Sequence, residues 1–466
     1  MDIKKAATTR FISYIFSFLI QIGTIFLLTI KLEIYQFSVW GIFMSLLFLL
    51  STIFQLSYVQ SIEKYFPNFN INKRQYLFTK YLKTIIFCFP VILLFLVLIN
   101  YFGYFEKFNI ENIFYLLIML SSLTIIESCL AISDVYFVST KNSEVFDKFD
   151  LLISKIPKIA IFYFLLINNY SVFYLIFVIL ILRLFFLIFI VRKEFNSLTK
   201  FLYSFFKNPI LKDNFLNTKY NVIAFANKTI YLSLINILFL LTSNFLLNID
   251  IAHYSIMVLI LNSLRPIMNT IPILLSPIIA NSIKDKLNIN IELQNFAIIN
   301  QIIIAISLFT VLLVVKFNYL IEFLFINYFE GIYDLILLSF LASTLNSIYQ
   351  AKYLQQLFNN EEVNILKFNI LNYGLSITFY FVIFYYFYLI NFIYIYMLYE
   401  FLYFLYITYL GNQRKNFNIN KREISITYSL SLFMVILNII NLEYLYYFLF
   451  VPVFLYFDFK RTSLSW

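Results

Sequence analysis

Long apolar runs recur along the whole chain and decide what it can fold into. Segments of roughly 17 to 25 apolar residues follow one another, and each is long enough to cross a hydrocarbon core about 30 Å thick as an α-helix. The hydrophobic fraction is 62% and the charged fraction 12%, whereas soluble domains carry about 25% charged residues. No globular interior can bury so much apolar surface. The sequence therefore predicts an all-α polytopic membrane protein.

The apolar runs give about fourteen predicted spans. Three of them are short for a full crossing (156–168, 426–440 and 444–458), which leaves twelve or thirteen as alternative counts. The first run lacks a cleavage site of small residues, so we expect a retained helix and not a removed signal peptide. The spans are 11–30, 39–58, 84–102, 113–138, 156–168, 172–191, 221–247, 254–279, 296–315, 333–351, 369–388, 391–410, 426–440 and 444–458.

Lysines and arginines lie almost entirely on one side of these spans. If the N-terminus is cytoplasmic, only Lys31, Lys107 and Lys316 fall in external connections. Because positive loops near helix ends stay in the cytoplasm, we predict that both termini are cytoplasmic. Topology and anionic membrane lipids then account for the net charge of +10, which indicates no nucleic-acid partner.

The chain divides at its longest polar segment, residues 192–220. Residues 1–191 form a predicted six-helix bundle, residues 221–410 a second one, and residues 411–466 two additional transmembrane helices. The segment 192–220 is basic and rich in aromatic residues, which suits an amphipathic helix on the membrane surface; a solvated linker is the alternative. We predict that the segment is cytoplasmic.

A weak internal repeat relates the two halves. Leu-Ser-Ser-Leu at 120–123 aligns without a gap with Leu-Ser-Phe-Leu at 338–341, and Glu144-Val145 aligns with Glu362-Val363. Two halves with equal numbers of spans are what a parallel pseudo-twofold transporter needs, with a site between them near the middle of the membrane.

Residues with catalytic or metal-binding patterns are missing from the sequence. Cys88 and Cys129 lie in separate predicted spans and form no metal or disulfide framework. His253 lies at an external helix boundary, where an interfacial role is expected. External connections are short, so no extracytoplasmic catalytic domain fits. We therefore predict that the protein is not an enzyme and carries no catalytic residue, cofactor or metal.

Three cations lie inside predicted spans. Arg265 is eleven residues into its span, about 17 Å deep, Arg183 is as deep in the sixth span, and Lys228 lies in the seventh. A charge at such depth costs at least about 2.5 kcal/mol, so each should face the bundle interior or a water-filled cavity. We expect all three at the seam between the halves.

Acids and prolines accompany these cations. Glu127 and Asp134 are seven apart and so on one helix face, and Glu400 lies midway along the twelfth span. Either these acids pair with the cations and hold helices together, or the charges form a functional site. The span of Arg265 contains three prolines, which can bend it and free backbone carbonyls. They are Pro266, Pro272 and Pro277.

The layout resembles a known family. Two six-span halves, two further spans, a basic linker and Ser-Ile-Glu-Lys-Tyr-Phe-Pro at 61–67 are similar to polysaccharide flippases of the Wzx type, in the multidrug, oligosaccharidyl-lipid and polysaccharide exporter superfamily. The resemblance implies a MATE-like fold of two pseudo-symmetric bundles plus two helices. It also implies a flippase in the bacterial inner membrane that turns undecaprenyl-diphosphate-linked oligosaccharide toward the periplasm for O-antigen or lipopolysaccharide assembly, with polysaccharide polymerase machinery as a partner.

A diphosphate suggests a role for the buried charges. Guanidinium groups bind phosphate oxygens through paired hydrogen bonds, so we expect Arg265, Arg183 and Lys228 to hold it in a central cavity while alternating access re-exposes the site. Glu127, Asp134 and Glu400 could couple this to protons or sodium.

Three alternatives stay open. A lipid II flippase of peptidoglycan synthesis shares the span count. A drug or metabolite antiporter of the same superfamily shares the layout but would rely on cavity acids more than cations. A membrane glycosyltransferase or polymerase would need a large external loop, which the sequence does not provide.

Overall fold

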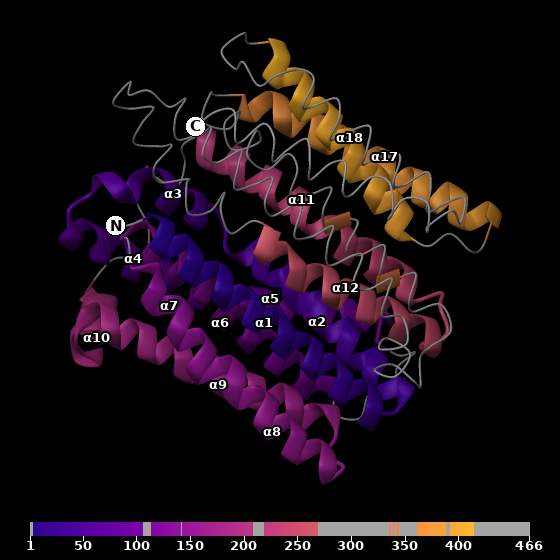
Figure 1. The fold of residues 1–466 in the computed structure, drawn as a ribbon, viewed down its shortest axis with the longest axis horizontal. Helices are drawn as coiled ribbons and strands as arrows, with labels where there is room; N and C mark the ends of the chain where they lie inside the picture. The colour runs from indigo at the N-terminus through magenta and orange to yellow at the C-terminus, as the bar shows by residue number, and fades with distance from the viewer. Residues whose placement is uncertain are drawn as a thin grey trace, which may run out of the picture.

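The structure, a computed structural model, is helical wherever it is described (Figure 1). Within the described residues, seven helices are long and apolar enough to cross a membrane. The described part is thus that of an all-α polytopic membrane protein. The structure describes residues 3–105, 113–140, 142–207, 219–268, 361–387 and 392–413, together with 335, 336, 339, 342 and 343.

The N-terminal half contributes a continuous series of helices and the second half four described helices. In chain order they are α1 (Ile3–Lys31), α2 (Ile34–Phe54), α3 (Tyr58–Tyr65), η1 (Phe66–Asn68), α4 (Ile71–Ile86), α5 (Phe89–Tyr101), α6 (Ile113–Ser139), α7 (Ser143–Phe149), η3 (Asp150–Lys155), α8 (Ile156–Ile167), α9 (Val172–Phe195), α10 (Leu198–Lys207), α11 (Lys219–Ser243), α12 (Asn248–Met268), α17 (Glu362–Phe387) and α18 (Phe392–Gln413).

Each predicted span up to residue 191 coincides with a helix or a run of helices. The predicted second span, 39–58, extends past the end of the helix. α2 ends at Phe54, and Leu56 adopts a left-handed backbone (φ 50°) that interrupts the helix. The predicted spans 296–315, 426–440 and 444–458 lie outside the described residues, as does most of 333–351.

The fifth predicted span, 156–168, is only the end of a longer helical segment. α7, η3 and α8 follow one another without a break from residue 143 to residue 167. The middle piece, Asp150–Lys155, is a π-helix, a wider turn that is frequent at functional positions. Charged residues in the first half of this segment made it read as a loop, so the sequence interpretation of that stretch was wrong.

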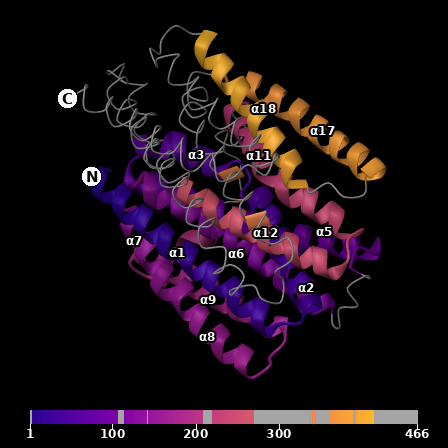
Figure 2. The ribbon, with the colours of Figure 1, turned by 45° about the vertical axis from the view of Figure 1, so that its right-hand side comes forward.

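α2 lies at the centre of the described bundle. It packs against α6 and also against α11 and α12. Of the apolar stretch of α2 that is long enough to cross a membrane, 72% is buried. α1 also contacts α12, so the first two helices of each half meet, while α17 and α18 lie together on the outer side of α11 (Figures 1 and 2). α5 instead exposes large apolar side chains such as Leu94 and Leu98, as a lipid-facing helix does.

The same kinds of helix pair recur in both halves. α1 packs on α8 and α8 on α9, as α11 packs on α17 and α17 on α18. In the aligned repeat, Ser121 Oγ donates to Leu117 O (2.8 Å) and Ser339 Oγ donates to Leu335 O (2.7 Å). These parallels agree with the internal repeat; the division into domains stays a prediction.

Gly41 permits a close contact between the two halves. A Cβ built on Gly41 would lie 1.8 Å from Ser255 Oγ and 2.2 Å from Ser255 Cβ. One turn away, Ser38 Oγ donates a hydrogen bond to Asn248 O (2.7 Å). Small side chains therefore bring α2 against α12, as is common where membrane helices pack tightly.

We expect Gly41→Ala to destabilise the protein by about 1 to 3 kcal/mol, because the added methyl overpacks the α2–α12 contact. Adding Ser255→Gly should restore stability, since the nearest remaining atom, the Ser255 Cα, is 3.4 Å away. Gly374→Ala is the matched control, because its Cβ meets nothing within 4 Å. Membrane abundance and the melting midpoint in detergent report the outcome. A stable Gly41→Ala protein would contradict the tight contact.

Candidate functional site

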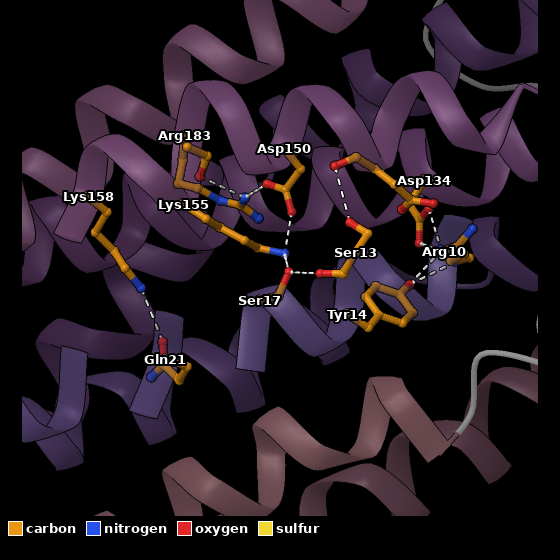
Figure 3. A network of polar contacts seen from close by, with 12 residues as sticks. Arg10, Ser13, Tyr14, Ser17, Gln21, Asp134, Asp150, Lys155, Lys158 and Arg183 are labelled. Carbon is orange, nitrogen blue, oxygen red and sulfur yellow. Dashed lines mark hydrogen bonds and ion pairs between the residues drawn. The ribbon is translucent and has the colours of Figure 1, made fainter. Parts of the chain in front are cut away.

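A stripe of polar residues runs along one face of α1. Their spacing of three or four residues places them on one side of the helix. Thr24, one step further, is also fully buried. The side chains on this face point toward Asp134, Lys155 and Lys158 (Figure 3). The stripe consists of Arg10, Ser13, Tyr14, Ser17 and Gln21.

A second polar stripe lies on residues 143–167 and faces the first, because α1 packs against α7, η3 and α8. Lys155 Nζ donates a hydrogen bond to Ser17 Oγ (2.8 Å). Lys158 Nζ donates one to Gln21 Oε1 (3.1 Å). The two stripes thus join in a polar network within the N-terminal half. The second stripe consists of Asp147, Asp150, Ser154, Lys155 and Lys158.

Arg183 is held by two carboxylates. Its Nε and Nη2 donate to the two oxygens of Glu127 (2.5 and 2.6 Å). Its Nη1 donates to Asp150 Oδ1 (2.6 Å) and to Ser154 Oγ (3.2 Å). The other oxygen of Asp150 lies 2.5 Å from Lys155 Nζ. A diphosphate could bind this guanidinium only by displacing the carboxylates.

Arg10 closes the network at the other end. Its Nη2 donates to both oxygens of Asp134, and Nε and Nη2 also contact Tyr14 Oη (3.0 and 2.7 Å). The arginine side chain is fully buried, and its Nη1 has no partner. The sequence interpretation expected Asp134 to pair with an intramembrane cation or to couple ions. Its partner is Arg10, which lies before the first predicted span.

Formal charges balance across the network. Four cations and four acids compensate one another between α1, α6, α7, η3, α8 and α9. This balance lets the charges remain among apolar helices, where an unpaired ion would cost several kcal/mol. The cations are Arg10, Lys155, Lys158 and Arg183, and the acids are Glu127, Asp134, Asp147 and Asp150.

Asp147 is the least satisfied acid of this group. It is 3% exposed, and no group in the described part of the chain donates a hydrogen bond to its Oδ2. Burial raises the pKa of Asp147 to about 7, with Asp134 and Asp150 adding to the rise and Arg10 and Lys155 opposing it. This carboxyl group, which precedes the predicted span 156–168, therefore exchanges its proton near neutral pH.

Lys228 of α11 faces a different set of groups. Its Nζ donates to Gln55 Oε1 (3.4 Å), directly after α2. The nearby carboxyl group of Glu63 in α3 supplies the opposite charge; burial raises the pKa of Glu63, and Lys228 opposes that rise. Lys228 therefore bridges the two halves at α2 and α3.

Arg265 of α12 is buried among neutral groups. It is 3% exposed. Its Nη2 donates to Tyr396 Oη (2.6 Å), while Nη1 donates to Asn262 Oδ1 (3.2 Å) and to Leu232 O (3.3 Å). Its Nε has no hydrogen-bond partner among the described residues. Tyr396 is hydrogen-bonded to Glu400, so an acid lies one tyrosine away. Among the described residues, no carboxylate forms a direct ion pair with Arg265.

The three predicted cations thus keep separate partners. Arg183 belongs to the network of the N-terminal half, Lys228 to the α2–α3–α11 contact, and Arg265 to α11, α12 and α18. Pro266 lies inside α12 and is exposed; Pro272 and Pro277 lie outside the described residues. The sequence interpretation missed five network members, because charged residues near span ends read as loop residues. They are Arg10, Asp147, Asp150, Lys155 and Lys158.

Comparison with known proteins gives no relative. No family model, curated protein or solved structure matches the chain. Within the described ranges, His, Cys, Asp and Glu side chains form no group of three or more that could hold a metal ion. Function must therefore be argued from the buried charges.

Removing Arg183 should leave Glu127 without its cation. We expect Arg183→Met to destabilise the protein by about 3 kcal/mol, the lower end of the range for buried pairs, because the two side chains are 18% and 23% exposed. The double variant with Glu127→Gln should recover most of the loss, since Asp150 keeps Lys155. Melting midpoints in detergent measure both. A double variant as unstable as the single one would contradict the pairing.

Stability should also depend on the proton of Asp147. Because the pKa of Asp147 is raised in the folded protein, the native state keeps this proton between about pH 4 and pH 7, where the unfolded chain loses it. The stabilisation that the bound proton provides is therefore present at low pH and lost as the pH rises through 7. We expect a loss of up to about 1.4 kcal/mol per pH unit in that window. Asp147→Asn should flatten the profile. Melting curves from pH 5 to pH 8 that are parallel for both proteins would contradict this.

Proposed function

We propose that the protein is a flippase of the bacterial inner membrane for undecaprenyl-diphosphate-linked oligosaccharide in surface polysaccharide assembly. In this proposal the chain has about fourteen transmembrane helices in a MATE-like arrangement, with both termini cytoplasmic. The halves alternate between two orientations around a site at their seam. The recurring helix pairs and the contact of α1 and α2 with α11 and α12 support such an arrangement.

The observation that carries this proposal is the state of Arg265. A buried guanidinium that makes no direct ion pair within the described residues, and whose Nε has no hydrogen-bond partner among them, keeps its positive charge available for an anion. Guanidinium binds phosphate oxygens through a planar fork of donors. A substrate diphosphate would supply the missing negative charge, while the isoprenoid chain stays in lipid.

The other predicted site residues take different parts in this proposal. Lys228 lies between the halves and is held by a 3.4 Å contact with Gln55, so it can turn toward the same anion. Arg183 stays with its carboxylates and keeps the N-terminal bundle together. Glu127 and Asp134 are engaged by arginines, which makes them less available for ion coupling than Glu400 or Asp147.

The alternatives differ in what they require of these charges. A small-molecule antiporter would need free acids facing a cavity, whereas Glu127 and Asp134 are both neutralised. A lipid II flippase would carry the same diphosphate and lipid with a different glycan. The buried charges therefore favour a lipid diphosphate as substrate class, and the glycan is distinguished by which surface polymer is lost when the gene is deleted.

Substitution of Arg265 tests the proposal. Arg265→Ala should abolish polysaccharide export while the protein stays at normal abundance, and Arg265→Lys, which keeps the charge but loses the fork, should leave partial export. Surface polysaccharide and membrane protein level are measured together, in cells whose only copy is the variant. Normal export by an abundant Arg265→Ala protein would overturn the assignment.

A matched pair of variants separates binding from packing. If Arg265 serves only to neutralise Glu400 through Tyr396, Arg265→Ala should lower abundance, and adding Glu400→Gln should restore both abundance and export. If Arg265 holds the substrate, the double variant should remain inactive.

A further inference from the structure

α10 has an apolar edge that no part of the described chain covers. None of its ten residues is buried. At 100° per residue, Leu198, Leu202 and Phe206 fall within an arc of about 80°, and they are 39%, 48% and 76% exposed. The two lysines of the helix, Lys200 and Lys207, lie on the opposite side. A short helix with this distribution suits the boundary between lipid and water.

The position of α10 places it at such a boundary. It follows α9, a membrane-length apolar helix, after one left-handed residue, Asn196 (φ 55°). It packs back on α9 and on α4, and Lys83 Nζ donates to Phe205 O (2.8 Å). α10 therefore lies across the end of the bundle and not along it (Figure 1).

α9, the helix before α10, also exposes apolar side chains. Phe185 and Ile188 of α9 are 61% and 39% exposed, as expected of side chains that face acyl chains. The exposed edge of α10 begins ten residues after Ile188. We therefore expect lipid to contact the exposed side chains of α9, the helix that precedes α10.

The charges around α10 are almost all positive. Arg192, Lys193, Lys200 and Lys207 are exposed. The single acid of residues 192–207, Glu194, is occupied: Gln75 Nε2 and Tyr136 Oη both donate to its Oε1 (3.0 and 2.5 Å). This end of the bundle therefore complements an anionic surface.

We propose that α10 is a membrane-surface helix whose apolar edge inserts among acyl chains and whose lysines bind anionic phospholipid headgroups. The helix then ties the end of α9, and through Lys83 the last turn of α4, to the membrane surface. This inference rests on membrane embedding alone and holds whatever the chain transports.

Site-directed spin labels test the insertion. In a Cys88→Ser background, with Cys129 fully buried, labels are placed at Leu202→Cys and Phe206→Cys and, as matched controls, at Lys200→Cys and Lys207→Cys. The purified protein is reconstituted in vesicles of phosphatidylcholine with phosphatidylglycerol. The ratio of accessibility to oxygen over a water-soluble nickel chelate should be severalfold higher at 202 and 206 than at 200 and 207.

Uniform nickel accessibility at all four positions would overturn the proposal. A face reserved for a partner protein would give that result, because the vesicles contain no other protein.

Charge removal tests the headgroup contact separately. The association of spin-labelled phosphatidylglycerol, relative to phosphatidylcholine, should fall about fivefold for each lysine removed in Lys200→Gln and Lys207→Gln, since a lysine at an anionic surface contributes about 1 kcal/mol. Lys31→Gln is the control, because Lys31 is an exposed lysine at the C-terminal end of α1 and not in α10. This substitution should change the association little. Unchanged association in the double variant would overturn the headgroup assignment.

Discussion

The need to compensate buried charge governs the N-terminal half. Arg183 joins α9 to α6 through Glu127 and to η3 through Asp150, and Arg10 joins α1 to α6 through Asp134. Each contact links helices that hydrophobic packing alone would leave free to slide, because lipid tails are as apolar as the helix surfaces they would replace. An ion that loses its partner in such surroundings costs several kcal/mol. The ion pairs therefore fix which helix faces meet and in what register.

The second half uses neutral groups at comparable helix contacts. Where α11, α17 and α18 meet, Asn369 Nδ2 donates to Asn227 Oδ1 (2.8 Å) and Tyr399 Oη donates to Asn369 Oδ1 (3.3 Å). Amide and hydroxyl groups satisfy one another there without net charge. Against this background Arg265 is conspicuous as a full charge whose direct partners are all neutral. Within the described residues, the N-terminal half is thus held together by compensated charges, whereas Arg265 of α12 is bonded directly to neutral groups.

Helix positions were predictable from the sequence because hydropathy alone reports them, and α1, α6 and α9 lie close to where apolar runs placed them. The network was not predictable, for two reasons. Its partners are far apart in sequence, 124 positions for Arg10 and Asp134. In addition, charges near span ends read as loop residues, which removed Asp147, Asp150 and Lys155 from the helices they belong to. The sequence predicted that Arg265 lies within an apolar helix. Its hydrogen bonds to Asn262 and Tyr396 follow only from how α11, α12 and α18 pack.

The π-helix explains how Asp150 can serve two cations. In a regular α-helix, residues five apart point about 140° away from each other, so Asp150 and Lys155 would face different neighbours. A π-turn pairs residue i with residue i+5 and brings them onto one side, which is where the carboxylate meets Lys155 Nζ at 2.5 Å while its other oxygen accepts from Arg183. Asp150 therefore joins η3 to α9 through Arg183 and, because Lys155 also donates to Ser17 Oγ, the same turn is joined to α1. In α-helical geometry Lys155 would turn away from Asp150, and one carboxylate could not hold both cations.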